Sequence, residues 1–333
     1  MIRLTESPPR QRIPSAPLPW HRPLLALTAA MAICALIAVG GLVADGRTLT
    51  GQPIWAKPLK FAVSIAIYAL TWSWLLRQLT RFQRTAWWMG TLAALMLGVE
   101  MVVIVAAVLR GTTSHFNVST GLDATLWAVM GAAIVVAWVA TLVLSLFLLA
   151  SPGPDRARNL AIRSGALISI LGMAVAFLMV LPTAAQLQAP AGAIGAHSVG
   201  VPDDGAGLPI VGWSTEGGDL RIAHFLGMHA LQIIPLALLV CELLSRRVPV
   251  LRQVDVRARL VVVTATVLTA TTALLTWQAL RGQSIIRPDV LTWLAGAAIG
   301  VVAIAGVGWS LRAHSTTAPL SERQQPTPGQ SPR

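Results

Sequence analysis

The chain has 333 residues, of which 55% are hydrophobic and 11% are charged, and its formal net charge is +12. Soluble globular domains carry about 25% charged residues, so this composition excludes an ordinary soluble protein and indicates a polytopic membrane protein. The positive charges are spread over the gaps between apolar segments. That distribution is typical of positive residues that orient a protein in the bilayer and contact lipid headgroups. It argues against nucleic-acid binding.

Eight apolar segments are each long enough to cross a hydrocarbon core about 30 Å thick. The expected spans are 23–44, 58–76, 88–109, 125–150, 164–185, 223–244, 259–280 and 290–311. Of the 25 Lys and Arg residues, 18 fall at the termini or in every second gap. Because cytoplasmic segments are enriched in these residues, we expect a bacterial inner-membrane protein with both termini in the cytoplasm.

This pattern divides the chain into four parts. We expect a cytoplasmic tail over 1–22, a first four-helix half over 23–150, a second half over 151–311 and a disordered cytoplasmic tail over 312–333. The segment 186–222 is a long outer loop, and loops of this size often cover binding sites. Its apolar residues weaken the competing interpretation of disorder. Cys34 and Cys241 lie at different expected depths, so we expect no disulfide.

The two halves resemble each other at the ends of their helices. Arg110 and Arg281 both close a span and are both followed by Gly, while Asp123 and Asp289 both begin the next span. Because each half holds an even number of spans, the halves enter the membrane in the same orientation. The expected fold class is therefore all-α transmembrane, with eight helices in two four-helix halves related by a pseudo-two-fold axis along the membrane normal. Coincidence between apolar sequences is the alternative.

Glycines on two spans predict close helix packing. Gly296, Gly300 and Gly308 share a face of the last span, and Gly131 opens a similar surface on the fourth. Helices in lipid associate through small residues, which let their backbones approach. We expect these glycines to lie at helix contacts.

Glu100 is the most informative single residue. It lies about nine residues from the outer end of the third span, which places it about 14 Å deep. Ionisable side chains at that depth are costly and usually have a function. The alternative is a structural ion pair, or a protonated carboxyl bonded to Ser64 or Tyr68.

Two histidines stand in the sixth span. His229 lies about 12 Å deep, and His224 is about 140° around the same helix, so the two rings are not expected to bind one metal together. A hydrogen bond between helices is the competing role for His229. Pro235 follows on the same helix and is expected to kink it into a cavity.

The remaining candidate residues lie on the expected outer side. His115 stands in a short turn before Asp123, as an oriented base, a metal ligand or an exposed turn residue. The candidate catalytic residues are Glu100, His115 and Asp123; the candidate cofactor-binding residues are His224, His229, Lys60, Arg110 and Arg221; and the candidate metal ligands are His115, His224 and His229.

Three strings carry a resemblance. GQPIWAKPLKF (51–61), RGTTSHFN (110–117) and HFLGMHALQ (224–232) resemble an uncharacterised group of multi-pass membrane proteins from high-GC actinobacteria. The resemblance implies no activity. Two four-helix halves are also similar in architecture to haem A synthase, but its paired histidines are missing, because Lys60 stands where the counterpart of His224 would be.

Four functions fit these observations. They are a haem- or transition-metal-dependent redox protein, a proton-coupled transporter or small-molecule binder, a zinc-dependent hydrolase of a lipid-like substrate, and a structural or assembly subunit of a membrane complex. We prefer an outward-facing ionisable pocket for a cofactor or small molecule, with the cofactor unassigned. The expected partners are the lipid bilayer, a small-molecule or lipid ligand reaching the outer face, and a membrane-complex partner, but no nucleic acid.

Overall fold

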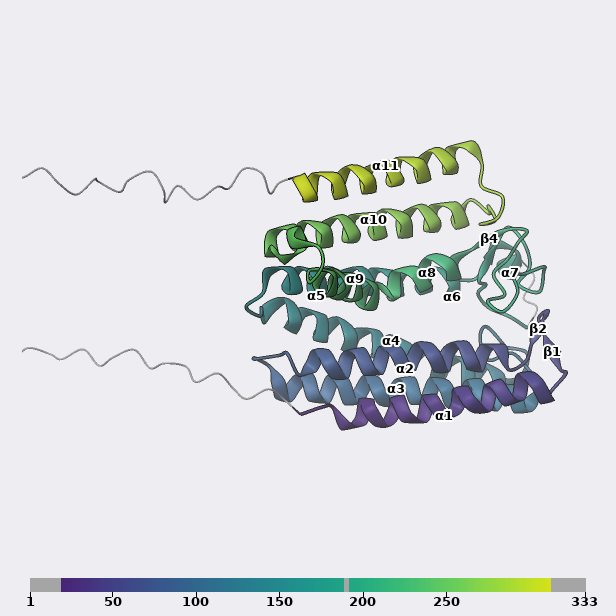
Figure 1. Cartoon of the computed structure of the whole chain (residues 1–333). Coiled ribbons are helices and arrows are strands. Elements are labelled where there is room, and N and C mark those ends of the chain that lie inside the picture. Colours follow the sequence, from purple (N-terminus) through teal and green to yellow (C-terminus); the bar gives the residue numbers. More distant parts are fainter. Residues whose placement is uncertain (1–18, 189–191, 313–333) are drawn as a thin grey trace, which may run out of the picture.

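A computed structural model of the chain describes residues 19–188 and 192–312. This part is mostly helical, with four two-residue strands at one end (Figure 1). The expectations for the two tails concern 1–18 and 313–333, which lie outside the described residues, as do 189–191 of the long loop. The helical part of the fold-class prediction is confirmed.

The long helices cover nearly all of the expected spans. They are α1 (Arg22–Ala44), α2 (Ala56–Leu76), α3 (Gln83–Arg110), α4 (Gly121–Ala150), α5 (Arg156–Ala174) continued by α6 (Ala176–Val180), α8 (Leu220–Met228) followed by α9 (Ala230–Leu244), α10 (Val254–Leu280) and α11 (Val290–Arg312). Among the described residues, seven helices are long and apolar enough to cross a membrane, and the bent pair α8 and α9 makes an eighth. The chain therefore has the helices of a multi-pass membrane protein.

The fifth span differs most from its predicted bounds. It covers 156–180 instead of 164–185. The helix begins earlier because the side chain of Asp155 caps it by accepting from the backbone N–H of Arg158. It ends earlier because Leu181, before Pro182, is extended, as residues preceding proline usually are.

The sixth span is bent by 49° between α8 and α9. The break lies at His229, six positions before Pro235. Pro235 itself stays inside α9, where its missing N–H leaves the carbonyl of Leu231 without the usual helical donor. The expected kink is thus present, but it is centred on a histidine and not on the proline.

The bundle has two distinct ends. α1 begins and α11 finishes at one of them, which we call the arginine end (Figure 1). The opposite end, the loop end, holds the hairpin of β1 (Thr48–Leu49) and β2 (Gln52–Pro53), the pair β3 (Ser198–Val199) and β4 (Gly218–Asp219), and α7 (Ala184–Gln188). The cytoplasmic location of the arginine end stays a prediction from charge.

Ion pairs tie three helices together at the arginine end. Arg158 of α5 binds Glu242 of α9 through two hydrogen bonds of 2.9 and 3.0 Å. Arg257 of α10 reaches both Glu242 and Asp155, at 3.6 and 3.7 Å. These arginines therefore join helices as well as contributing charge to this end of the bundle.

Helices α1 to α4 pack mainly on one another, and α5, α8, α9, α10 and α11 form the other group, with α4 against α5 (Figure 1). The core of the first group surrounds Trp72 and Leu144, which expose 1% and 0% of their surface. A second core joins α5, α9 and α10 around Ile234. A pseudo-two-fold relation between the groups stays a prediction.

The prediction for the glycines was wrong. A Cβ added at Gly131, Gly296, Gly300 or Gly308 would meet no atom within 4 Å in the described part of the chain. The close backbone approach lies elsewhere, at Gly172 of α5, where a Cβ would collide with the backbone of α8. Periodic spacing on one helix did not reveal which helix lies opposite, and that decides where a small residue is needed.

Candidate functional site

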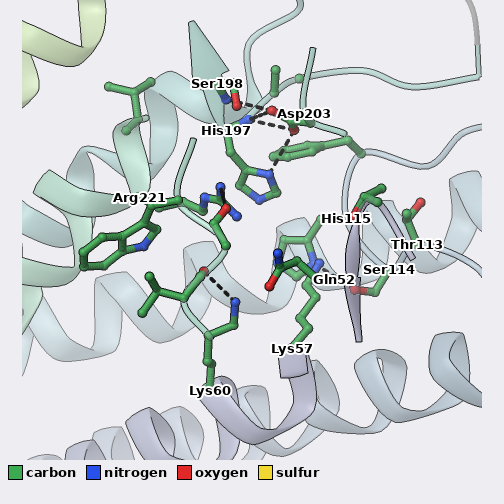
Figure 2. Close-up of a pocket in the computed structure, with 18 of the residues that line it drawn as sticks. Gln52, Lys57, Lys60, Thr113, Ser114, His115, His197, Ser198, Asp203 and Arg221 are labelled. Atoms are coloured by element: carbon green, nitrogen blue, oxygen red, sulfur yellow. Dashed lines mark hydrogen bonds and ion pairs between the residues drawn. The ribbon is translucent and has the colours of Figure 1, made fainter. Parts of the chain in front are cut away.

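A cavity of about 1210 Å³ lies at the loop end. Its walls come from α2, α3, α6 and α8, from the turn after α3, from the β1–β2 hairpin and from the long loop before α8 (Figure 2). Most of the lining is apolar, and a few charged and imidazole side chains converge within it. Large apolar cavities with a small number of convergent polar groups are the usual form of small-molecule sites.

The N-terminal end of α2 places two lysines in this cavity. Lys57 and Lys60 are one helical turn apart and both line it. Lys60 donates through Nζ to the backbone carbonyl of Val211 in the long loop, at 2.8 Å. Lys57 extends into the same hollow as His115 (Figure 2). Lys60 was predicted as a site residue, whereas Lys57 was not.

Arg221 lines the cavity from the first turn of α8, opposite the lysines. It is ion-paired with Asp219 at 2.6 Å, and its Nη2 also donates to the carbonyl of Gly212 at 2.6 Å. Asp219 is fully buried, and it caps α8 by accepting from the backbone N–H of Arg221. The arginine is therefore held firmly, with its charge largely offset by one carboxylate.

Glu100 is buried in α3, with 4% of its surface exposed. Its Oε1 lies 3.4 Å from Nε2 of His115, and its Oε2 has no hydrogen-bond partner among the described residues. The hydroxyls named as alternatives are engaged elsewhere: Tyr68 pairs with Thr141, and Ser64 with His229. Glu100 lies behind His115 and does not itself line the cavity.

His115 reaches Glu100 because the turn after α3 folds back into the bundle. Gly111 ends α3 with a φ of 67°, and Phe116 also has a positive φ, of 63°. Asn117 braces the turn by donating to the hydroxyl of Thr112 and the carbonyl of Thr113, at 2.8 and 3.2 Å. These contacts turn the imidazole inward, so His115 is not an exposed turn residue.

The imidazole of His115 is enclosed by aromatic rings. Phe61, Phe116 and Trp127 have ring centroids 5.5, 6.1 and 5.6 Å away. Burial lowers the pKa of His115 well below its usual value, and the positive charge of Lys57, together with that of His197 when it is protonated, lowers it further. The ring is therefore neutral near pH 7.

The long loop contributes a second histidine, which the sequence interpretation did not select. His197 lies 4.7 Å from Phe116, centroid to centroid, and its Nδ1 is 2.9 Å from Asp203. Burial raises the pKa of Asp203, but hydrogen bonds from His197 and Ser198 outweigh this effect and hold the pKa below its usual range. Asp203 is therefore ionised and committed to its own loop.

His229 and His224 diverge, as their angular separation predicts. His229 lines the cavity at the bend of the sixth span, with Ser64 and Gln232 each 3.3 Å from its ring nitrogens. His224 points the other way, and its Nδ1 lies 2.9 Å from the carbonyl of Gly172. That contact holds α8 against α5, so His224 lies apart from the cavity.

Arg110 and Asp123 form a separate pair. Arg110 Nη1 donates to Asp123 Oδ1 at 2.7 Å, and Thr120 also donates to this carboxylate, at 2.6 Å. Neither residue lines the cavity. Glu100 takes the place next to His115 that the sequence interpretation gave to Asp123.

The three histidines proposed as metal ligands are not brought together. Within 19–188 and 192–312, no group of three or more His, Cys, Asp or Glu side chains is placed to hold a metal ion. Cys34 and Cys241 are both free thiols. The geometry therefore gives the haem and metal hypotheses no support.

Three further lining residues were missed by the sequence interpretation: Lys57, Asp203 and His197. His197 and Asp203 are six positions apart in a loop without periodicity, and only the fold shows that they face α2 and α3. Lys57 could have been found from the sequence. A lysine in the first turn of a helix is unfavourable because it opposes the helix dipole, and this indicates a functional role.

No family model, no curated protein and no solved structure matches the chain.

Proposed function

We propose that this membrane protein binds a small molecule in the cavity at the loop end. The observation that carries the proposal is an apolar cavity of about 1210 Å³ lined by Lys57, Lys60, Arg221 and three histidines. Typical sites for drug-sized ligands occupy about 300–1,000 Å³, so the space suits a ligand of that size or larger. By the positive-inside rule this end faces the outside of the cell.

Native mass spectrometry of the detergent-purified protein tests this proposal. We expect wild type to retain a co-purifying molecule and Val63→Trp to lose it, because Val63 of α2 lines the cavity. Val301→Trp is the matched control, since Val301 of α11 is likewise an exposed apolar helix position but lies outside the lining. Equal occupancy in both variants would contradict the proposal.

Proton-coupled transport is a second candidate, favoured by Glu100 and His115. A buried carboxylate with an unpaired oxygen, next to an imidazole at the cavity wall, is an arrangement that suits proton exchange. Under this candidate, ligand uptake into vesicles would acidify or alkalinise the lumen in wild type. Glu100→Gln would retain ligand binding and lose the proton movement.

We also propose that the two halves are related by duplication. The aligned pairs Arg110–Asp123 and Arg281–Asp289 form ion pairs of 2.7 and 2.6 Å, each linking the end of one helix to the start of the next. Gly111 and Gly282 follow the two arginines with φ values of 67° and 71°. An arginine–aspartate pair and a glycine with positive φ at each of the two aligned helix junctions support the pseudo-two-fold relation better than the apolar similarity alone.

A further inference from the structure

The charges of the cavity point to the kind of ligand. Its lining contains three cationic side chains, Lys57, Lys60 and Arg221, and one carboxylate, that of Asp203. Building on the proposed function, we infer that the ligand is an amphipathic anion, whose carboxylate or phosphate group lies at the two lysines while its apolar chain fills the rest of the cavity.

The position of the lysines in α2 supports an anion. The first turn of a helix carries partial positive charge and unsatisfied N–H groups, so lysines are unfavourable there. The first turn of α2 contains no acidic residue, and Trp55, at its N-cap, makes no side-chain capping bond. The cationic side chains and the helix dipole both favour a negatively charged group at this place.

The lysines have donors to spare. Lys57 has no hydrogen bond and no ion pair within 4 Å among the described residues, and Lys60 uses a single donor on Val211. Glu100 exerts an electrostatic influence on Lys57 but makes no ion pair with it, and the side chain next to its carboxylate is the neutral imidazole of His115. Burying an ammonium group in an apolar cavity without a hydrogen bond or an ion pair costs free energy, and a bound anion would offset that cost.

The nearby carboxylates do not neutralise the lysines. Asp203 accepts hydrogen bonds from the backbone N–H groups of His197 and Ser198 at 2.7–3.0 Å, and from the ring of His197. Asp219 is paired with Arg221 and accepts from the backbone of Ser214. Both carboxylates are therefore already bonded to other groups, and the positive charge of the lysines remains available to a ligand.

The rest of the lining matches an apolar chain. The apolar wall is formed in part by Phe61, Ile67, Ile104, Val108, Leu178 and Phe225. Because these side chains come from α2, α3, α6 and α8, the apolar space continues from the lysines between the helices. A small hydrophilic anion would leave this surface without contacts, which argues for an amphipathic one.

Fluorescence titration with 11-(dansylamino)undecanoic acid tests this inference. The probe has a carboxylate and an apolar chain, and its methyl ester is the neutral counterpart. For wild type in detergent, corrected for empty micelles, we expect the acid to bind at least about tenfold more tightly than the ester, since a charged hydrogen bond contributes about that factor. Dodecanoate should displace it, whereas acetate and inorganic phosphate should not.

The variants separate charge from apolar space. Lys57→Gln should weaken binding of the acid about tenfold and leave that of the ester unchanged. Arg287→Gln is the matched control, because Arg287 is also at the loop end but does not line the cavity. Thermal melting checks that each variant is folded.

Three results would overturn the inference: equal affinity for acid and ester in wild type, an equal loss in Arg287→Gln, or displacement by acetate as effective as by dodecanoate. If both probes bind equally and Val63→Trp blocks both, the cavity binds a molecule but the anion inference fails. If neither probe shows binding that Val63→Trp removes, the proposed function fails as well.

Discussion

Lys60 near the N-terminal end of α2 donates a hydrogen bond of 2.8 Å to the carbonyl of Val211, 151 positions later in the chain. This bond joins the first group of helices to the long loop that covers the cavity. Arg221 donates to the next carbonyl, that of Gly212, at 2.6 Å. Two cationic side chains from different helices thus hold one short loop segment over the site.

The first prediction concerns this attachment. Lys60→Met should release the segment around Val211, because a hydrogen bond from a charged donor contributes about 1.5–3 kcal/mol. Amide hydrogen exchange in 206–213 should become about tenfold faster or more. Exchange in α10 should be unchanged in the same sample. Unaltered exchange around Val211 would show that the loop is held by other contacts.

The second prediction concerns helix packing. Gly172→Ala should destabilise the protein by about 1–3 kcal/mol, because the new Cβ would collide with the backbone of Gly227 where α5 and α8 approach. Gly131→Ala is the control, since its Cβ would meet nothing within 4 Å. Thermal melting in detergent compares the two. Equal melting temperatures would contradict the close approach of α5 and α8.

The third prediction concerns pH. Burial holds the pKa of His197 below its usual value of 6.5, although its hydrogen bond with Asp203 raises it. The unfolded chain therefore takes up a proton near pH 6.5, whereas the folded protein does so only at lower pH. Unfolding is favoured as the pH falls below about 6.5. The lowered pKa of His115 makes a contribution in the same direction.

Melting temperatures between pH 8 and pH 5 measure this effect. Wild type should lose stability below about pH 6.5, and a His115→Gln, His197→Gln double variant should show a shallower dependence in that range. The contribution of Asp203 does not interfere, because its pKa is lowered from 3.8 and its protonation lies further toward acid. A double variant with the wild-type slope would refute this assignment.

The fourth prediction concerns the two arginine–aspartate pairs. Double-mutant cycles with Arg110→Met and Asp123→Asn, and with Arg281→Met and Asp289→Asn, should both give favourable coupling of up to about 1 kcal/mol. The first should be larger, because the side chain of Asp123 is 5% exposed and that of Asp289 is 38% exposed. A coupling that is absent in one pair would weaken the equivalence of the two helix junctions.

Much of the fold was predictable, because the bilayer imposes long apolar helices and the sequence shows them directly. The bounds of α1, α2 and α11 agree with the predicted spans to within two residues. Helix ends set by a single cap, such as Asp155, were not predictable from hydropathy. The bend at His229 was assigned to Pro235, because proline is the usual local cause.

The candidate site was predictable only in part. Lys60, Arg221, His115 and His229 do line the cavity, since charged or polar groups near the outer ends of the spans were sought for that reason. Arg110, Asp123 and His224 are also charged or polar residues near the ends of spans. Arg110 and Asp123 pair with each other, and His224 bonds the carbonyl of Gly172, which only the three-dimensional arrangement reveals. The same is true of His197, because nothing local in a long loop specifies where it folds.

The central claim is that the cavity at the loop end holds an apolar chain. Photo-crosslinking tests this claim most directly. Diazirine-labelled palmitic acid would be added to the purified protein, irradiated and mapped by peptide mass spectrometry. We predict labelling of residues 59–67 of α2 and 104–108 of α3, reduced by Val63→Trp. Labelling confined to exposed positions of α11 such as Ile304, with none in the cavity wall, would contradict the claim.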